Sequence, residues 1–383
     1  MESIEELLEN DDVKLFRNFM NKGEAPYNYE KQLLRQHFKR VALILKGNLV
    51  PPYELEIQPT SKCNLRCDHC FGKACKRIPD KLGKKGMEEI ARKVEDFRYD
   101  DLKIDNIKFC GITGEPLVNS ATMYGIEIFK NIGKKVFLFS NGLWLDKEVD
   151  GKSYIDYILE ADRLILSLDA GSPETFKRLK KVDGFDRIVK SLDELLKRRN
   201  GSNPNVVVSY VIGSKNYNDI VQATELARKI GADEIRFRVD FTDKQKIHEL
   251  SDIIIDNIHQ AKELNDDNFK VISMYSEKGV RKDDSEFASY GVNCFIHNLW
   301  ACIGPNGELY SCGHRTKAEV ESFGSILEKS FQELWYSNKR RECVKDLPDK
   351  HCEYCSPYSV RINEFGTQLC KFKLKHKIFP EDI

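Results

Sequence analysis

Residues 53–70 read YELEIQPTSKCNLRCDHC, a short β-rich run followed at once by three cysteines, Cys63, Cys67 and Cys70. Three thiolates on one loop can hold three irons of a four-iron cluster and leave the fourth iron open to an outside ligand. A zinc ion is the alternative, and it would need a fourth ligand from Cys75, His69 or elsewhere to complete its tetrahedron. The position of this loop at the end of a strand favours the iron–sulfur cluster.

The run that starts at Tyr53 is the first of six similar β-rich runs, which alternate with amphipathic helical stretches such as MEEIARKVEDF and FDRIVKSLDELLKRR. Parallel strands need long crossover connections, and the helices between the runs supply them. The pattern predicts an α/β fold with a partial (β/α)6 TIM-like barrel, because six units are too few to close an eight-fold barrel. A flat, doubly wound sheet is the alternative. The six runs are residues 53–58, 104–110, 134–140, 163–169, 205–212 and 234–239.

Further elements are expected after the sixth unit. The sequence predicts a helix over 245–264 and a strand over 269–275. A β-hairpin with Asn306-Gly307 at its turn follows, and then a helix from Ser330 to about Val344. The tail KFKLKHK, residues 371–377, alternates basic and apolar residues, which is typical of a solvated edge strand guarded by lysines.

Length, charge and cysteine content limit the classes of function. The chain has 383 residues, with 61 Lys and Arg balanced by 61 Asp and Glu. Zero net charge argues against bulk nucleic-acid binding. No apolar stretch approaches the length of a membrane span, and the acidic N-terminus does not resemble a signal peptide. We therefore expect a cytoplasmic protein with neither a nucleic-acid nor a membrane partner. In such a chain, 12 cysteines in two clusters indicate metal or redox chemistry before disulfides.

The cysteine motif and the strands behind it resemble the radical SAM enzymes, from about Tyr53 to Asp240. That resemblance implies that Cys63, Cys67 and Cys70 bind a 4Fe-4S cluster, and that S-adenosylmethionine (SAM) chelates its open iron. An electron passed to SAM then releases a 5′-deoxyadenosyl radical, which abstracts a hydrogen atom from the substrate. An electron donor such as flavodoxin or ferredoxin is implied as a partner.

Motifs after the later strands resemble the SAM-binding positions of the same family. Gly111-Ile-Thr-Gly114-Glu115-Pro116 is similar to the family's Gly-Gly-Glu-Pro loop, with Thr113 replacing a glycine. The resemblance implies that Glu115 helps to hold the SAM amino group. It also implies that one of the two arginines on the sixth strand reaches the SAM carboxylate, depending on which points inward. The implied cofactor-binding residues are Gly114, Glu115, Pro116, Asn141, Ser167, Asp169, Arg236 and Arg238.

Two further cysteines lie near this first centre. Cys75 is expected to be a bystander beside the cluster loop. Cys110 ends the second strand, where buried packing is the expected role. The alternative for Cys110 is that it faces the pocket and donates a hydrogen atom to a substrate radical.

A second thiol centre lies near the C-terminus, where a hairpin cysteine is followed by a distant CxxC pair. It resembles the SPASM domain of radical SAM enzymes in its shortened form, the twitch domain. The resemblance implies one auxiliary 4Fe-4S cluster, with zinc as the alternative. Packing is expected for Cys302, and Cys343 and Cys370 are reserve ligands. The expected ligands are Cys294, Cys312, Cys352 and Cys355.

These features divide the chain into four predicted segments. A helical lead-in, with Leu7, Leu8, Leu15 and Phe16 at helical spacing, precedes the radical SAM core, a connecting segment and the auxiliary-cluster domain. The predicted boundaries are 1–48, 49–242, 243–293 and 294–383.

Taken together, the motifs and the resemblance predict a radical SAM enzyme of oxidoreductase type. Its first expected substrate is a ribosomally made peptide, which it would oxidise, epimerise or cross-link. The alternative substrate is a small polar metabolite, a sugar or an aminocyclitol, that is dehydrogenated or epimerised. A metal-sensing or electron-relay protein is the alternative outside the enzymes, and the open-iron motif argues against it.

Overall fold

The computed structural model describes residues 29–73, 75–201, 203–240, 242–273, 275, 293–352, 355 and 357–376. The apolar positions predicted for the first part of the helical lead-in, from Leu7 to Phe16, lie outside these residues. The second part of the lead-in is helical, since α3 spans Tyr29–Leu45.

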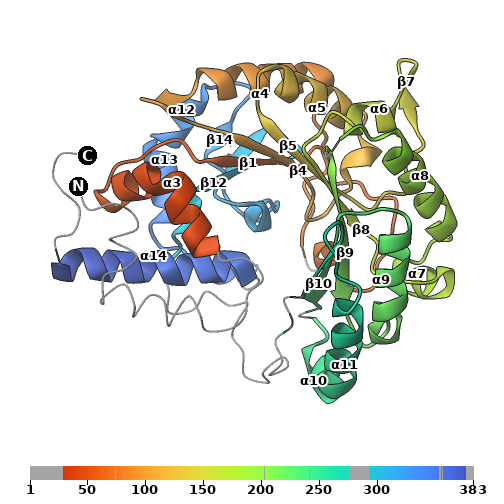
Figure 1. The fold of residues 1–383 in the computed structure, drawn as a ribbon. Helices are drawn as coiled ribbons and strands as arrows, with labels where there is room; N and C mark the ends of the chain where they lie inside the picture. Colours follow the sequence, from red (N-terminus) through yellow and green to blue (C-terminus); the bar gives the residue numbers. More distant parts are fainter. Residues whose placement is uncertain are drawn as a thin grey trace.

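The centre of the fold is a ten-stranded sheet, most of it parallel (Figure 1). Seven of its strands follow one another across the sheet in chain order, and every neighbouring pair among them is parallel. A doubly wound sheet would reverse its strand order at a switch point, whereas here each crossover moves in the same direction. The partial barrel is therefore confirmed, with a seventh parallel strand where a strand was predicted over 269–275. The seven strands are β1 (Glu54–Ile57), β4 (Asn106–Phe109), β5 (Lys135–Ser140), β8 (Arg163–Ser167), β9 (Asn205–Ile212), β10 (Glu234–Val239) and β11 (Lys270–Ser273).

Helices connect these strands along the outside of the barrel (Figure 1). The predicted helix over 245–264 forms as two helices, α10 and α11. Two small hairpins, β2–β3 and β6–β7, lie within the connections between the sheet strands. The helices are α4 (Lys84–Asp96), α5 (Ala121–Asn131), α6 (Tyr154–Ile158), α7 (Pro173–Lys180), α8 (Phe185–Arg198), α9 (Ile220–Lys229), α10 (Lys244–Glu249) and α11 (Ser251–Lys262). The hairpin strands are Arg98–Tyr99 with Leu102–Lys103, and Glu148–Val149 with Lys152–Ser153.

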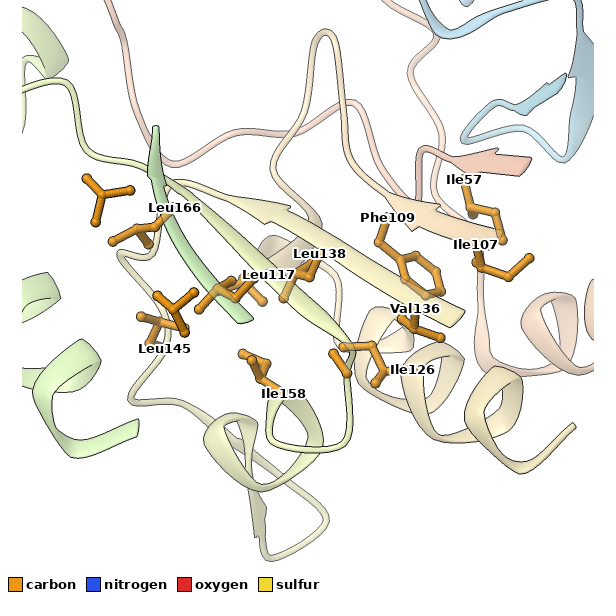
Figure 2. Close-up of a cluster of buried hydrophobic side chains, with 14 of the residues drawn as sticks. Ile57, Ile107, Phe109, Leu117, Ile126, Val136, Leu138, Leu145, Ile158 and Leu166 are labelled. Atoms are coloured by element: carbon orange, nitrogen blue, oxygen red, sulfur yellow. The ribbon is translucent and has the colours of Figure 1, made fainter. Parts of the chain in front are cut away.

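Alternation along the strands separates an apolar layer from a polar barrel interior. Ile57, Ile107, Phe109 and Val136 belong to the buried core between sheet and helices (Figure 2). Their strand neighbours face the other way, so the inner face carries polar and charged groups. These groups include Glu54, Glu56, Lys108, Ser167, Ser209, Glu234 and Arg236.

The C-terminal cysteine region extends the same sheet. Strand β12 (Trp300–Ile303) pairs in parallel with β1 on the side away from β4. The predicted hairpin is confirmed, with β13 (Glu308–Tyr310) antiparallel to β12 and β14 (Gly324–Ser325) antiparallel to β13. Gly307 occupies the hairpin turn with a φ of +75°, a conformation that glycine adopts without strain.

Two expectations for the C-terminal helices are wrong. The single helix expected from Ser330 to Val344 is two helices, α12 (Phe331–Trp335) and α13 (Asn338–Val344), because Ser337 caps the second by accepting from the Arg340 backbone N–H. The tail expected as an edge strand is helical as far as His376, within α14 (Pro357–His376). Apolar residues of α14 and α3 share one core cluster, and this packing outweighs the period-two pattern of the tail. The members from these two helices are Leu33, Val41, Leu45, Ile362, Phe365 and Leu369.

Candidate functional site

The first cysteine loop leaves the C-terminal end of β1 and is tied to the last turn of α7. The Arg66 backbone N–H donates to the Lys180 carbonyl at 3.1 Å, and that of Asp68 donates to the Leu179 carbonyl at 3.0 Å. Cys63, Cys67 and Cys70 are all partly exposed, and none of them forms a disulfide. The pKa of Cys67 is raised to about 11 by burial, against the opposing charge of Lys180, and the other two thiols add to that rise. The three thiols are therefore close enough to act on one another electrostatically.

The Gly-Glu-Pro loop packs directly onto this cysteine loop. A Cβ added at Gly114 would lie 1.9 Å from the Thr60 carbonyl oxygen, so only glycine fits there. The Glu115 backbone N–H donates to the Lys62 carbonyl at 2.9 Å. The following residues, Pro116–Val118, form a single 3-10 turn.

The Glu115 carboxylate joins the ends of β4 and β5. One oxygen accepts from the Leu117 backbone N–H at 3.0 Å and from the Ser140 hydroxyl at 2.7 Å, and the other accepts from the Asn141 backbone N–H at 2.8 Å. Burial raises the pKa of Glu115, and these donors oppose that rise. Because the carboxylate already holds three protein donors, a SAM ammonium group has only its remaining lone pairs to contact.

Asn141 brings the end of β5 to the cysteines. Its amide nitrogen donates to Asn64 Oδ1 at 2.8 Å and lies 3.9 Å from the Cys63 sulfur. Gly114, Glu115 and Asn141, which the resemblance implies as cofactor-binding residues, thus lie near the first cysteine.

Asp169 belongs to a buried group of ionisable side chains, and the sequence predicted only part of that group. Its carboxylate pairs with Lys180, and His69 Nε2 lies 3.3 Å from the same oxygen. Both Asp169 and Lys180 have almost no exposed side chain. Burial disfavours the charged carboxylate, but Lys180 and His69 hold the pKa of Asp169 well below its usual range. His69 was visible inside the cysteine motif, whereas nothing in the sequence singled out Lys180.

The carboxylate also fixes the backbone around the site. Its second oxygen accepts from the Val211 backbone N–H at 2.7 Å. Asp169 itself has a φ of +60°, a costly conformation that the surrounding contacts must hold in place. Ser167 ends β8 two residues earlier, on the inner face of the barrel.

The two arginines of β10 lie on the same face of the strand. Residues two apart on a strand point to the same face, so Arg236 and Arg238 share a face, opposite to the core residues Ile235 and Phe237. The expectation that the register would choose one of them is therefore wrong. The Arg236 guanidinium is already paired with Glu234 at 2.7 Å.

The inner face of β1 and β4 carries an ion pair that sequence reasoning missed. Glu56 lies 2.7 Å from the Lys108 ammonium and accepts from Gln58 Nε2 at 2.8 Å. Burial disfavours both charges, yet their pairing lowers the pKa of Glu56 and raises that of Lys108. Cys110 is buried beside this pair, and burial raises its pKa well above the usual value, with a further rise from Glu56. A neutral buried thiol fits the packing expected for Cys110 and leaves hydrogen donation open.

The cysteines predicted for the second thiol centre also influence one another. The pKa of Cys294 is raised to about 12, first by burial and then by the charges of Cys352 and Cys355. Burial also raises the pKa of Cys312, and the other three thiols add to the rise. The four cysteines, from distant parts of the sequence, are thus close enough to act on one another electrostatically.

The remaining cysteines take other positions. Cys302 is buried in β12, with its sulfur 3.2 Å from the Thr316 hydroxyl, as expected for a packing residue. Cys75 is buried and lies 3.6 Å from the Phe71 carbonyl oxygen. Cys343 lies on α13, and Cys370 is exposed on α14.

Among the described residues, neither thiol centre shows the close grouping of ligands that a single metal ion requires. A single zinc ion would draw its sulfurs to within about 4 Å of one another. Within the part of the chain that the structure describes, no three His, Cys, Asp or Glu side chains are grouped as one metal ion requires. The thiols nevertheless act on each other electrostatically in both centres. Both centres supply the thiol ligands that a four-iron cluster takes.

The two thiol centres lie next to each other. The segment after Cys312 folds across the inner faces of β12 and β1, and Gln58 Nε2 donates to the Gly313 carbonyl at 3.1 Å. A Cβ at Gly313 would lie 2.1 Å from a Glu56 carboxylate oxygen, so this approach needs a glycine. The rings of Phe71 and His314 are 5.3 Å apart, which joins the residue after Cys70 to the turn after Cys312.

An open α/β barrel with two adjacent thiol centres at its polar inner face defines an iron–sulfur enzyme. The model of the radical SAM superfamily matches residues 57–233, and that of an iron-sulfur cluster-binding domain, SPASM, matches residues 294–356. The chain belongs to the radical SAM superfamily, in its SPASM/twitch subgroup. With that family come a SAM-binding 4Fe-4S cluster, SAM itself and auxiliary iron–sulfur binding.

Curated relatives resemble part of the chain. A probable GTP 3′,8-cyclase of Saccharolobus islandicus (strain Y.N.15.51 / Yellowstone #2) is 28% identical over 186 residues, which is 48% of this chain and 56% of the relative. A probable GTP 3′,8-cyclase of Methanothermobacter thermautotrophicus is 24% identical over 185 residues, with the same shares. The matched region thus spans little more than half the length of these relatives.

Solved structures share the fold over most of the chain. Streptococcus suis SuiB bound to S-adenosylmethionine has a TM-score of 0.59 at 17% identity, covering 87% of this chain and 77% of SuiB. The protein anSMEcpe with bound AdoMet has a TM-score of 0.55 at 17% identity, covering 81% of this chain and 88% of that one. No helix among the described residues is both long and apolar enough to span a membrane.

Proposed function

We propose that this enzyme cleaves SAM reductively and abstracts a hydrogen atom from a ribosomally made peptide, which it then oxidises or cross-links. Cys63, Cys67 and Cys70 hold the SAM-binding cluster in this proposal. Cys294, Cys312, Cys352 and Cys355 hold one auxiliary cluster. When bound, the first cluster supplies the electron that breaks a carbon–sulfur bond of SAM.

The chain's own residues shape the site around these cofactors. Gly114 allows the Gly-Glu-Pro loop to reach the cysteine loop, and Glu115 holds that loop to the end of β5. Asn141 lies beside the Cys63 sulfur, where it orients the first ligand. Asp169, paired with Lys180, fixes the turn after β8. These residues act mainly by positioning, since preorganised groups need no rearrangement when the reaction occurs.

The observation that carries the proposal is the contact between the two cysteine loops at the inner face of the barrel. Gln58, Gly313, Phe71 and His314 make that contact. In this proposal, a substrate radical formed at the first centre has the second centre close by. An electron acceptor close to the substrate radical favours net oxidation over a redox-neutral reaction.

The peptide substrate is supported by likeness in fold. Streptococcus suis SuiB has been solved bound to its precursor peptide SuiA, with a TM-score of 0.58 over 87% of this chain. The protein anSMEcpe has been solved with AdoMet and peptides. A nucleotide is the second candidate substrate, since the curated relatives are probable GTP 3′,8-cyclases.

The domains follow from the same proposal. Residues 49–242 form the radical SAM core, 243–293 connect it to the auxiliary-cluster region at 294–383, and 1–48 precede the core. An electron donor such as flavodoxin or ferredoxin reduces the first cluster.

Anaerobically reconstituted protein, SAM and dithionite test the proposal. The chain should form 5′-deoxyadenosine, and a variant with Cys63, Cys67 and Cys70 changed to alanine should form none while it keeps about half of the iron. Synthetic peptides from short reading frames that flank the gene should lose two hydrogens each when they are oxidised. GTP is the comparison substrate. Consumption of GTP with no change in any peptide would overturn the peptide assignment, and absence of SAM cleavage would overturn the function.

A further inference from the structure

One buried arginine lies against the second thiol centre and belongs to none of the motifs. Arg315 follows Cys312 in a short 3-10 turn, and its backbone N–H donates to the Cys312 carbonyl at 3.1 Å. Its side chain is only 8% exposed. A buried guanidinium is costly unless a specific partner faces it.

The partners of the Arg315 side chain lie in the segment that leads to and carries the CxxC cysteines, Cys352 and Cys355. One guanidinium nitrogen lies 2.6 Å from Asp349 Oδ1 and 3.5 Å from the Cys352 sulfur, to which it donates. The turn after Cys312 thereby reaches the loop that carries the CxxC pair. The positive charge of Arg315 also acts on Cys294, where it lowers the thiol pKa against a larger rise from burial.

A fixed positive charge at this place changes how easily a cluster accepts an electron. Reduction adds negative charge to a cluster, and hydrogen bonds to its sulfurs and nearby charges set its reduction potential. Asp349 opposes the arginine, but its side chain is 32% exposed, so water screens its charge more than that of Arg315. Lys317, another cation nearby, donates to the His351 carbonyl at 3.4 Å.

We propose that Arg315 is a positioning residue that raises the reduction potential of the auxiliary cluster, because it holds a buried positive charge against the Cys352 sulfur. The arginine thus makes the second centre an electron acceptor rather than a structural clamp. This inference rests on the proposed function only in its choice of Cys294, Cys312, Cys352 and Cys355 as ligands.

The test is a redox titration of the auxiliary cluster alone, monitored by electron paramagnetic resonance. The host is the full chain with Cys63, Cys67 and Cys70 changed to alanine, so that SAM cleavage does not enter the measurement. Arg315→Gln should shift the midpoint potential to a more negative value, and Arg315→Lys should shift it less. Asp349→Asn should shift the midpoint in the opposite direction, to a more positive value. Iron content is measured for each variant.

Matched controls come from an exposed pair on the outside of the barrel. Arg187 and Asp146 form a two-pronged ion pair, with both distances 2.7 Å. Arg187→Gln and Asp146→Asn should leave the midpoint unchanged.

Three results would overturn the proposal. One is an unchanged midpoint in both Arg315→Gln and Asp349→Asn, and another is a shift of the same sign in both. The third is a host chain without a paramagnetic cluster at the second centre. If Arg315→Gln loses its iron, the proposal is judged by the sign of the shift in midpoint potential in Asp349→Asn. A purely structural role for the Arg315–Asp349 pair predicts no positive shift. A failed peptide assay would leave these potentials as they are, so the two proposals fail separately.

Discussion

Replacing Lys180 by methionine should destabilise the protein far more than loss of an ordinary surface lysine. The substitution keeps most of the side-chain volume but leaves the Asp169 carboxylate buried, with the His69 ring as its remaining side-chain partner at 3.3 Å. Breaking a buried ion pair by removing one partner costs about 3–5 kcal/mol. Because His69 remains, we expect the lower part of that range, about 3 kcal/mol.

The assay is anaerobic urea denaturation followed by far-ultraviolet circular dichroism, with iron-free samples of each variant alongside because loss of a cluster breaks two-state behaviour. The double variant Lys180→Met, Asp169→Asn should recover most of the lost free energy of unfolding, since an amide still accepts from the Val211 N–H without a charge. Lys197 and Asp193 form the exposed control pair, at 2.6 Å on α8. Lys197→Met should cost about 0–1 kcal/mol. A Lys180→Met cost no larger than this control would refute the reasoning.

The same pair makes a prediction about pH. The pKa of Asp169 is lowered in the folded protein, so its contribution to stability is fully present above its unfolded pKa of about 3.9 and is lost as the pH falls through the lower folded value. In Lys180→Met, burial is opposed less than in the unsubstituted protein and should raise the pKa of Asp169, so that variant gains stability as the carboxyl takes up a proton. The difference in free energy of unfolding should therefore shrink between pH 7 and pH 4. A constant difference would contradict the assigned charge state.

Three more substitutions test the site. Gly114→Ala should cost the first cluster, because its Cβ would meet the Thr60 carbonyl at 1.9 Å; iron analysis should show about half of the iron lost, and full iron content would refute the close packing. Glu115→Gln should lower SAM cleavage about 10- to 100-fold, because its amide nitrogen would face a donor at Leu117 or Asn141; an unchanged rate of 5′-deoxyadenosine formation would argue against its positioning role. Cys110→Ala should retain product formation, since net oxidation needs no hydrogen donor; loss of product with normal SAM cleavage would instead identify Cys110 as that donor.

The fold and the first site were largely readable from local patterns. The β-rich runs and their helical connections predicted the order of the strands, because a parallel neighbour needs a crossover of that length. Cys63, Cys67 and Cys70 lie within eight residues of sequence, so their meeting on one loop needs no tertiary information. Gly114 and Asn141 follow strand ends, which converge at one edge of a parallel sheet.

The parts that escaped prediction depend on contacts between distant segments. Lys180 ends an ordinary amphipathic helix, and only the fold brings its ammonium to Asp169. The tail of α14 alternates like a strand, yet apolar residues earlier in the helix pack against α3 and carry the helix to His376. Arg315 lies in a turn whose sequence carries no signal for a sulfur contact across 37 residues.

The pairing of β12 with β1 explains why the two cysteine loops lie against each other. Strand β1 leads into the first cysteine loop, and β12 lies beside it in parallel, with Cys302 in register with Glu56. The turn after Cys312 then folds back onto the inner face of these two strands, where Gly313 touches Glu56 and Gln58. The auxiliary region is thus not appended to a finished barrel, because it supplies the sheet strand beside β1. A substitution that disturbs this contact, such as one at Gly313, should therefore affect both centres. A substitution at Arg315 should affect the second centre alone.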